Sequence, residues 1–197
     1  MSALLFDDLP RILELYDFDE HIVELAQEVK VNEPGYLLSS LLKDDHFGSA
    51  VSFLSHCLKK DFAIAWGYAC LIHVPVSWSQ QEMDVLGNIK SWLREPTDKH
   101  RRFHEKNLHS LGVKSPVAWL GQALFWSGGS ITPEDAPDVS PSPGLLGQAI
   151  SGAVQLAGLV EDGSHSSKLY PRFINLGIRV VEGMQKDELL SLKLVGV

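Results

Sequence analysis

A serine- and glycine-rich string is the first feature of this sequence that could bind a ligand. It reads FWSGGS and comprises Phe125, Trp126, Ser127, Gly128, Gly129 and Ser130. A phosphate cradle places its glycines between a strand and the start of a helix, so that backbone amides converge on the anion. Here a helical pattern precedes the glycines, a proline-rich segment follows them, and no lysine follows Gly129. The string therefore favours a helix end, where Gly128 or Gly129 takes a left-handed conformation that a side chain disfavours.

Two histidines have the spacing of a metal-binding helix. His100 and His104 are four residues apart, which places both rings on one face of a helix, as in zinc-binding helices. The string between them is HRRFH, which lacks the glutamate of the HExxH motif and adds two arginines that would oppose a cation. A solvated helix face is the favoured interpretation, so the sequence predicts no metal ion and no cofactor.

The two cysteines could act as nucleophiles only if their thiols were activated. Cys57 and Cys70 belong to no CxxC motif and share helical faces with apolar residues, which is typical of reduced, buried and inert thiols. His73 follows Cys70 by three residues, so a Cys/His pair stays open, although no strained turn presents either thiol. We expect His56 and His73 to be core or rim residues. The sequence therefore predicts no catalytic residue and a protein that is not an enzyme.

The segment KHRRFHEK, from Lys99 to Lys106, is the one basic cluster of an acidic chain. Arginine pairs suit the carboxylates of a partner. The alternative is a solvated face that Asp98 and Glu105 partly neutralise. With two acidic residues of the following loop, the candidate partner-binding residues are Lys99, Arg101, Arg102, His104, Glu134 and Asp135.

Composition limits the classes of function. Of 197 residues, 45% are hydrophobic and 21% charged, which is typical of a globular domain. The net charge of −8 repels phosphate backbones, so we expect no nucleic-acid partner. The N-terminus has acidic residues where a signal peptide needs basic ones, and no apolar run is long enough to cross a membrane. The chain is thus expected to be cytoplasmic.

The spacing of apolar residues is helical nearly everywhere, so the sequence predicts an all-α single domain, residues 1–197. We expect a bundle of about eight to ten helices stacked as helical hairpins. The segment from Asp61 to Val74 is apolar all round and should be a central, buried helix. Further predicted helices lie within about 7–43, from Phe47 to Leu58, from Ser79 to Glu95, from Thr97 to Leu111, from Ser115 to Ser127, and from about 168 to 190. Trp119 and Trp126 share one helical face, and both are expected to be largely buried.

The segment from Ile131 to Gly144 predicts a long loop, because it holds four prolines among acidic residues and serines. Each proline reduces the entropy lost when the loop orders. We expect an ordered strap with Ile131 and Val139 facing inward and the acidic side chains facing water. The strap and the basic helix should then border one protein-binding surface. The next helix, LLGQAISGAVQLAGLV, has small residues that would allow close backbone approach.

A wider pattern resembles a known family. Its members share a tryptophan, an acidic residue before proline, a double arginine, a helix start rich in alanine, FWSGGS and a proline-spaced loop. The matching residues here are Trp92, Glu95, Pro96, Arg101, Arg102, Ser115, Pro116, Trp119, Phe125 to Ser130, Pro133, Pro137, Pro141 and Pro143. The chain resembles, from about Ala50 to Gly158, an uncharacterised bacterial family named only as a domain of unknown function. It departs at Val117, where the family prefers alanine, and at Ala65–Ala69, a weakened form of an aromatic WWA element.

The resemblance implies a function only through genomic neighbourhood. Some family members lie near type VI secretion genes, which implies a cytoplasmic role associated with secretion; no catalytic residue can be carried over. We therefore expect a non-enzymatic interaction module, an adaptor, scaffold or chaperone-like protein, whose partner is a secretion-system component or effector. The alternatives are a helical enzyme or small-ligand binder with its site under the loop 131–144, and an immunity protein that neutralises a toxin.

Overall fold

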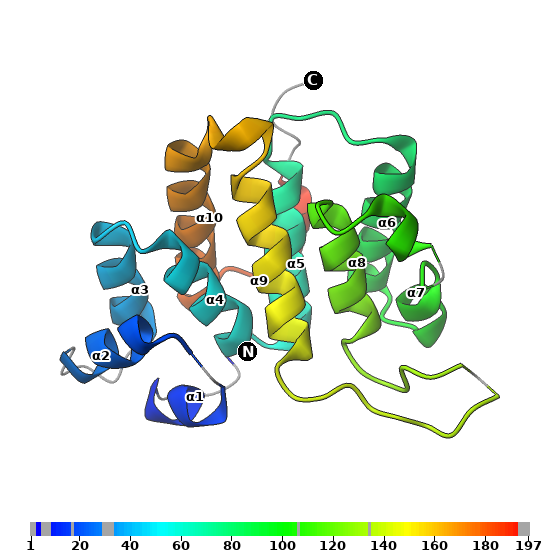
Figure 1. Cartoon of the computed structure of the whole chain (residues 1–197), viewed down its shortest axis with the longest axis horizontal. Helices are drawn as coiled ribbons and strands as arrows, with labels where there is room; N and C mark the ends of the chain where they lie inside the picture. Colours follow the sequence, from blue (N-terminus) through cyan, green and yellow to red (C-terminus); the bar gives the residue numbers. More distant parts are fainter. Residues whose placement is uncertain are drawn as a thin grey trace.

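The computed structural model describes residues 3–4, 9–16, 18–28, 34–105, 107–133 and 135–192 (Figure 1). These residues form eleven α-helices and two short 3₁₀ helices, and they contain no strand beyond one isolated bridge between Leu4 and Leu58. The all-α prediction is confirmed. The helices are α1 (Leu9–Leu15), α2 (Glu20–Glu28), α3 (Pro34–Lys43), α4 (Phe47–Cys57), α5 (Lys60–Ile72), α6 (Gln80–Arg94), α7 (Asp98–Arg102), η1 (Leu108–Leu111), α8 (Pro116–Phe125), α9 (Leu145–Gly158), η2 (Glu161–Gly163), α10 (Ser166–Val181) and α11 (Lys186–Ser191).

Helix α5 is the centre of the bundle, as its sequence predicts. Every residue from Phe62 to Ile72 is buried, because α4, α6, α8, α9, α10 and α11 all pack around it. Trp66 is completely buried, and its indole Nε1 donates a hydrogen bond of 2.9 Å to the Phe173 carbonyl oxygen of α10. A helix without a polar face is stable only in such surroundings.

Helix α9 lies beside α5, with α4 and α8 on either side (Figure 1). Its glycines allow this close packing, as expected from the sequence. A Cβ atom at Gly147 would lie 2.5 Å from the His56 ring of α4, and one at Gly152 would touch the Trp119 ring of α8. Small residues thus bring α9 close to both neighbours.

The C-terminal segment differs from the single predicted helix at about 168–190. Helix α10 ends at Val181, and Gly183 follows with a φ of +121°. Gln185 then begins α11 with a capping box that involves Glu188. Apolar periodicity continued across the break, but a glycine with positive φ ends a helix.

The polar segment after Thr97 is also not the long helix that the sequence predicted. Thr97 caps α7 as expected, and its side chain accepts a hydrogen bond from the His100 amide. However, α7 ends at Arg102, and the chain continues through turns to η1. Phe103 is exposed whereas Leu108 is buried, so no continuous apolar stripe could hold a longer helix against the bundle.

The proline-rich strap, residues 131–144, extends away from the helices between α8 and α9 (Figure 1). It is closed by its own hydrogen bonds: Ile131 N donates to Val139 O at 2.8 Å, and Thr132 Oγ1 donates to Pro137 O at 2.7 Å. Val139 is 48% exposed, so the prediction that it faces inward is wrong. The strap folds on itself rather than on the core. Asp135 is exposed, as expected, and Glu134 lies outside the described residues.

The Trp66 hydrogen bond yields a stability prediction. Trp66→Phe keeps most of the apolar volume but removes the donor to Phe173 O, so the free energy of unfolding should fall by about 1–3 kcal/mol. Trp66→Ala should lower it by about 3–5 kcal/mol. Urea titration measures both. Trp78→Phe is the matched control, because Trp78 Nε1 has no partner in the described part of the chain. Equal effects of the two Trp→Phe changes would contradict the prediction.

Candidate functional site

The FWSGGS string ends a helix, as the sequence predicts. Helix α8 stops at Phe125, and Trp126 forms its C-cap with an amide that donates to Gln122 O. Gly129 has a φ of +63°, the left-handed conformation expected at one of the two glycines. The chain therefore turns sharply at Ser127–Ser130, which we call the SGGS turn.

A buried arginine holds both ends of this turn. The Arg101 side chain is only 5% exposed and reaches from α7 to the end of α8. Its Nη1 donates to Phe125 O at 2.6 Å and its Nη2 to Ser130 O at 3.0 Å. Its Nε forms an ion pair of 2.6 Å with Asp98. The guanidinium thus spans the turn and fixes where the strap begins.

Arg102 extends the same clamp. It donates to Ser130 O at 2.8 Å and to Thr132 O at 2.6 Å, and it pairs with Glu105. Both guanidinium groups lie within 6 Å of the centre of the Phe125 ring. We call Arg101 and Arg102 the arginine clamp.

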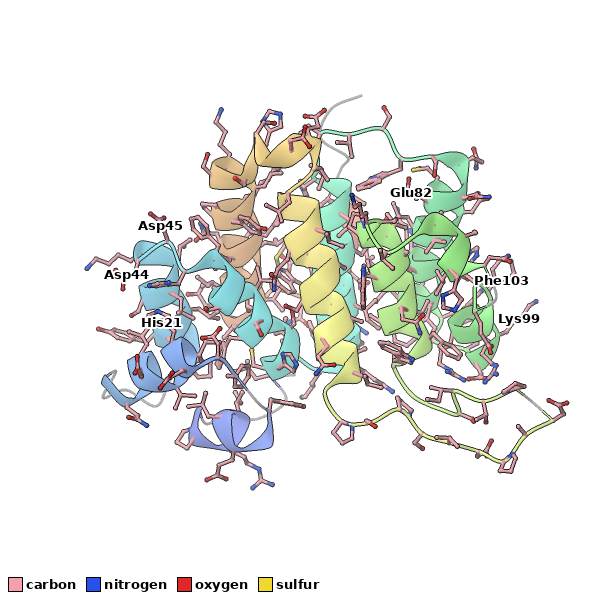
Figure 2. The ribbon with its side chains drawn as sticks, viewed as in Figure 1. His21, Asp44, Asp45, Glu82, Lys99 and Phe103 are labelled. Carbon is pink, nitrogen blue, oxygen red and sulfur yellow. The ribbon has the colours of Figure 1, made fainter. Side chains whose placement is uncertain are left out.

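The arginine clamp corrects the interpretation of the basic cluster. Arg101 is buried, so a solvated face is wrong for it, and both arginines form hydrogen bonds within their own chain. Lys99 differs, because it is exposed at the outer edge of α7 together with Phe103 (Figure 2). His104 is half-buried, with its Nε2 3.3 Å from Asp84 O.

The two histidines do not form the paired face that their spacing indicated. Helix α7 ends between them, and His100 Nδ1 lies within hydrogen-bonding distance of Thr97 Oγ1 and Glu95 O. The part of the chain that the structure describes holds no group of three or more side chains that could bind a metal ion.

The thiols and nearby histidines belong to the core. Burial raises the pKa of both Cys57 and Cys70, so these thiols stay protonated near neutral pH. Desolvation lowers the pKa of His73, whose Nδ1 bonds Ala69 O, and of His56, whose Nδ1 bonds Ser52 O. The expectation that both histidines are core or rim residues is confirmed.

Trp119 of α8 and Trp126 at its C-cap share a face, as predicted, and both pack against the core. Trp119 and Trp126 are only partly buried and line an apolar hollow of about 280 Å³ that the exposed Val113 also borders. Trp119 Nε1 donates to Val113 O at 2.9 Å. The opposite face of α8, which carries Val117 and Leu120, enters the core instead.

A cleft of about 820 Å³ lies beside the SGGS turn, and we call it the SGGS cleft. It lies between the turn, the start of α5, the end of α6, and α7 and α11. Its lining residues are Lys59, Lys60, Asp61, Trp92, Leu93, Pro96, Thr97, Asp98, Arg101, Ser127, Gly128, Gly129 and Lys186. Four of these are basic and two acidic, a surplus of two positive charges on a chain whose net charge is −8.

Sequence reasoning found the turn but missed the lysines of the cleft. Lys60 begins α5 and Lys186 begins α11, and Lys186 also forms an ion pair of 2.7 Å with Asp61. These positions are far apart in the chain and belong to no motif. Only the packing of α11 against α5 brings them together.

A family model described as a family of unknown function, DUF6931, matches residues 37–181. The chain belongs to this family. The DUF6931 match extends the resemblance from about 50–158 at both ends, and it includes the SGGS turn and every residue of the cleft except Lys186. No curated protein and no solved structure matches this DUF6931 chain. None of the described helices combines the length and apolarity that a membrane crossing needs.

The arginine clamp yields a second stability prediction. Arg101→Ala leaves Phe125 O and Asp98 without their buried cationic partner, so the free energy of unfolding should fall by about 2–4 kcal/mol. Lys99→Ala on the same helix is the control and should change it by less than about 0.5 kcal/mol. Urea denaturation followed by tryptophan fluorescence measures both. An Arg101→Ala protein as stable as the parent would refute the clamp.

The positive φ of Gly129 yields a third stability prediction. A side chain at Gly129 is strained by its φ of +63°, and its Cβ would lie 2.9 Å from Arg101 Nη2. Gly129→Ala should therefore destabilise the protein by about 1–2 kcal/mol, and Gly129→Val by more. Gly87→Ala is the matched control: it lies within α6 with open space around it, and should stabilise by up to about 1 kcal/mol. Thermal unfolding compares the three, and a harmless Gly129→Val would contradict the assignment.

Proposed function

We propose that this DUF6931 protein is a non-enzymatic interaction module, an adaptor, scaffold or chaperone-like protein, which holds an acidic segment of a protein partner in the SGGS cleft. The observation that carries the proposal is the positive surplus of a cleft on an acidic chain. Such a local field attracts carboxylates while the rest of the surface repels them. Following the family resemblance, the partner is a component or effector of type VI secretion, met in the bacterial cytoplasm.

The walls of the cleft support binding because internal contacts already fix them. The arginine clamp holds the turn, the Lys186–Asp61 ion pair ties α11 to α5, and Trp92 and Leu93 form an apolar wall. A site on packed elements loses little entropy when a partner binds. The candidate nucleophiles Cys57 and Cys70 lie in the core instead, which supports binding rather than catalysis.

A second candidate function is binding of a small anionic ligand. A cleft of about 820 Å³ lies within the size range of small-molecule sites. This placement differs from the expected site under the strap, because the cleft includes the turn before the strap and no residue of 131–144. An immunity protein would bind its toxin with the same surface. Only the identity of the partner would distinguish an immunity protein from an adaptor.

The test is capture of a partner from the native host by the full chain, followed by calorimetry with the purified partner. Lys60→Glu should weaken binding at least about tenfold, because Lys60 lines the cleft and is exposed without an ion pair in the described structure. Lys168→Glu makes the same charge change at an exposed position of α10, outside the cleft, and should bind as the parent does. A partner that binds both variants equally would refute this surface.

A further inference from the structure

The SGGS turn has hydrogen-bond donors that its own chain does not use. The backbone amides of Gly128, Gly129 and Ser130 donate to no acceptor among the described residues. The Ser127 side chain also lacks a partner there, although the residue is only 8% exposed and lines the cleft. Gly128 and Ser130 are half-buried and Gly129 is exposed, so these donors are accessible to an acceptor from outside the chain.

The arginine clamp explains why hydrogen-bond donors rather than acceptors remain unpaired at the turn. The carbonyl end of a helix carries partial negative charge and would repel an anion. Here Arg101 occupies Phe125 O at the end of α8 and Ser130 O at the end of the turn. The guanidinium thus covers the acceptors on both sides of the glycines and adds its own positive charge.

Two further positive groups line the cleft. A Cβ atom built on Gly128 would lie 3.6 Å from Lys60 Nζ, so this ammonium reaches across the cleft to the glycines. Lys60 is also the first residue of α5, a helix of 13 residues whose N-terminus has no side-chain cap. The N-terminal end of a helix carries partial positive charge and favours anions.

We propose that the SGGS turn is a binding subsite for a phosphate group, presented as a phosphate monoester. In the cleft the subsite offers the amides of Gly128 and Gly129, one hydroxyl and one ammonium, and these four donors suit the three terminal oxygens of a monoester better than the two of a carboxylate. A monoester carries about −1.5 to −2 charges near neutral pH, close to the cleft's surplus of two. The inference deepens, and rests on, the proposed binding function of the cleft.

This assignment changes how the sequence string is interpreted. The absence of a preceding strand and of a following lysine favoured a helix end over a phosphate cradle. In the structure the string ends a helix, and the lysine that faces the glycines comes from α5 instead. Successive free amides in a turn can form an anion site without a strand before them.

The experiment is a titration of the ¹⁵N-labelled full chain with inorganic phosphate, followed by NMR at constant ionic strength. The amide signals of Gly128, Gly129 and Ser130 should shift saturably, and acetate should bind at least about tenfold more weakly. Ser127→Ala and Lys60→Ala should each weaken phosphate binding about fivefold or more. Lys99→Ala, outside the cleft, should bind as the parent does.

Two ligands then distinguish the source of the phosphate. A phosphoserine peptide with acidic neighbours, compared with its unphosphorylated form, represents a modified protein partner; adenosine monophosphate represents a small metabolite. If the phosphoserine peptide or adenosine monophosphate binds more tightly than inorganic phosphate, the subsite is supported. The tighter of the two ligands then identifies the source of the phosphate.

Absence of saturable shifts, equal binding of acetate, or full binding by Lys60→Ala would overturn the inference. If phosphate fails but Lys60→Glu still loses the protein partner, only the subsite is refuted. If phosphate binds but Lys60→Glu keeps every partner, the subsite stands and the protein-interaction function is refuted.

Discussion

The burial of one positive charge governs the geometry around the cleft. A guanidinium that is 5% exposed must find anionic or carbonyl partners, since an unpaired buried charge is very costly. Arg101 finds them in Asp98 of its own helix, in the carbonyl oxygen of Phe125 at the end of α8, and in that of Ser130 in the SGGS turn. Because Arg101 needs these partners, α7 is held against the end of α8. The same contacts set the direction in which the strap leaves α8. Arg102 then fixes the first residues of the strap.

Helix α5 belongs both to the core of the bundle and to the wall of the cleft. Helix α5 is buried from Phe62 onward, and its first residues, Lys60 and Asp61, line the cleft. The apolar packing that stabilises the bundle therefore also positions the lysine that faces the glycines. The ion pair between Asp61 and Lys186 adds the C-terminal helix to the same wall.

Sequence patterns correctly predicted the features that depend on interactions between residues close together in the chain. The helical period, the apolar character of α5, the caps at Thr97 and Ser115, and the left-handed glycine all follow from nearby residues. The errors lie where distant contacts decide. The basic cluster looked solvated because nothing nearby in the sequence shows that Arg101 reaches carbonyls 24 and 29 residues away.

The same limit applies to the tryptophans and the cleft. Two aromatic residues on one helical face look like core, and only the packing of α8 shows that its other face is the more deeply buried one. The lysines of the cleft come from helix starts that no motif connects. The glycines could be found from sequence, but their neighbours could not.

Because the arginine clamp binds carbonyl oxygens of the turn, it recognises the path of the main chain and not the side chains along it. Ser127 could therefore be exchanged for another small residue while the loop kept its shape. In the proposed subsite, Arg101 fixes the turn and the Ser127 hydroxyl binds the phosphate, so a change at position 127 alone would alter the ligand preference on an unchanged framework.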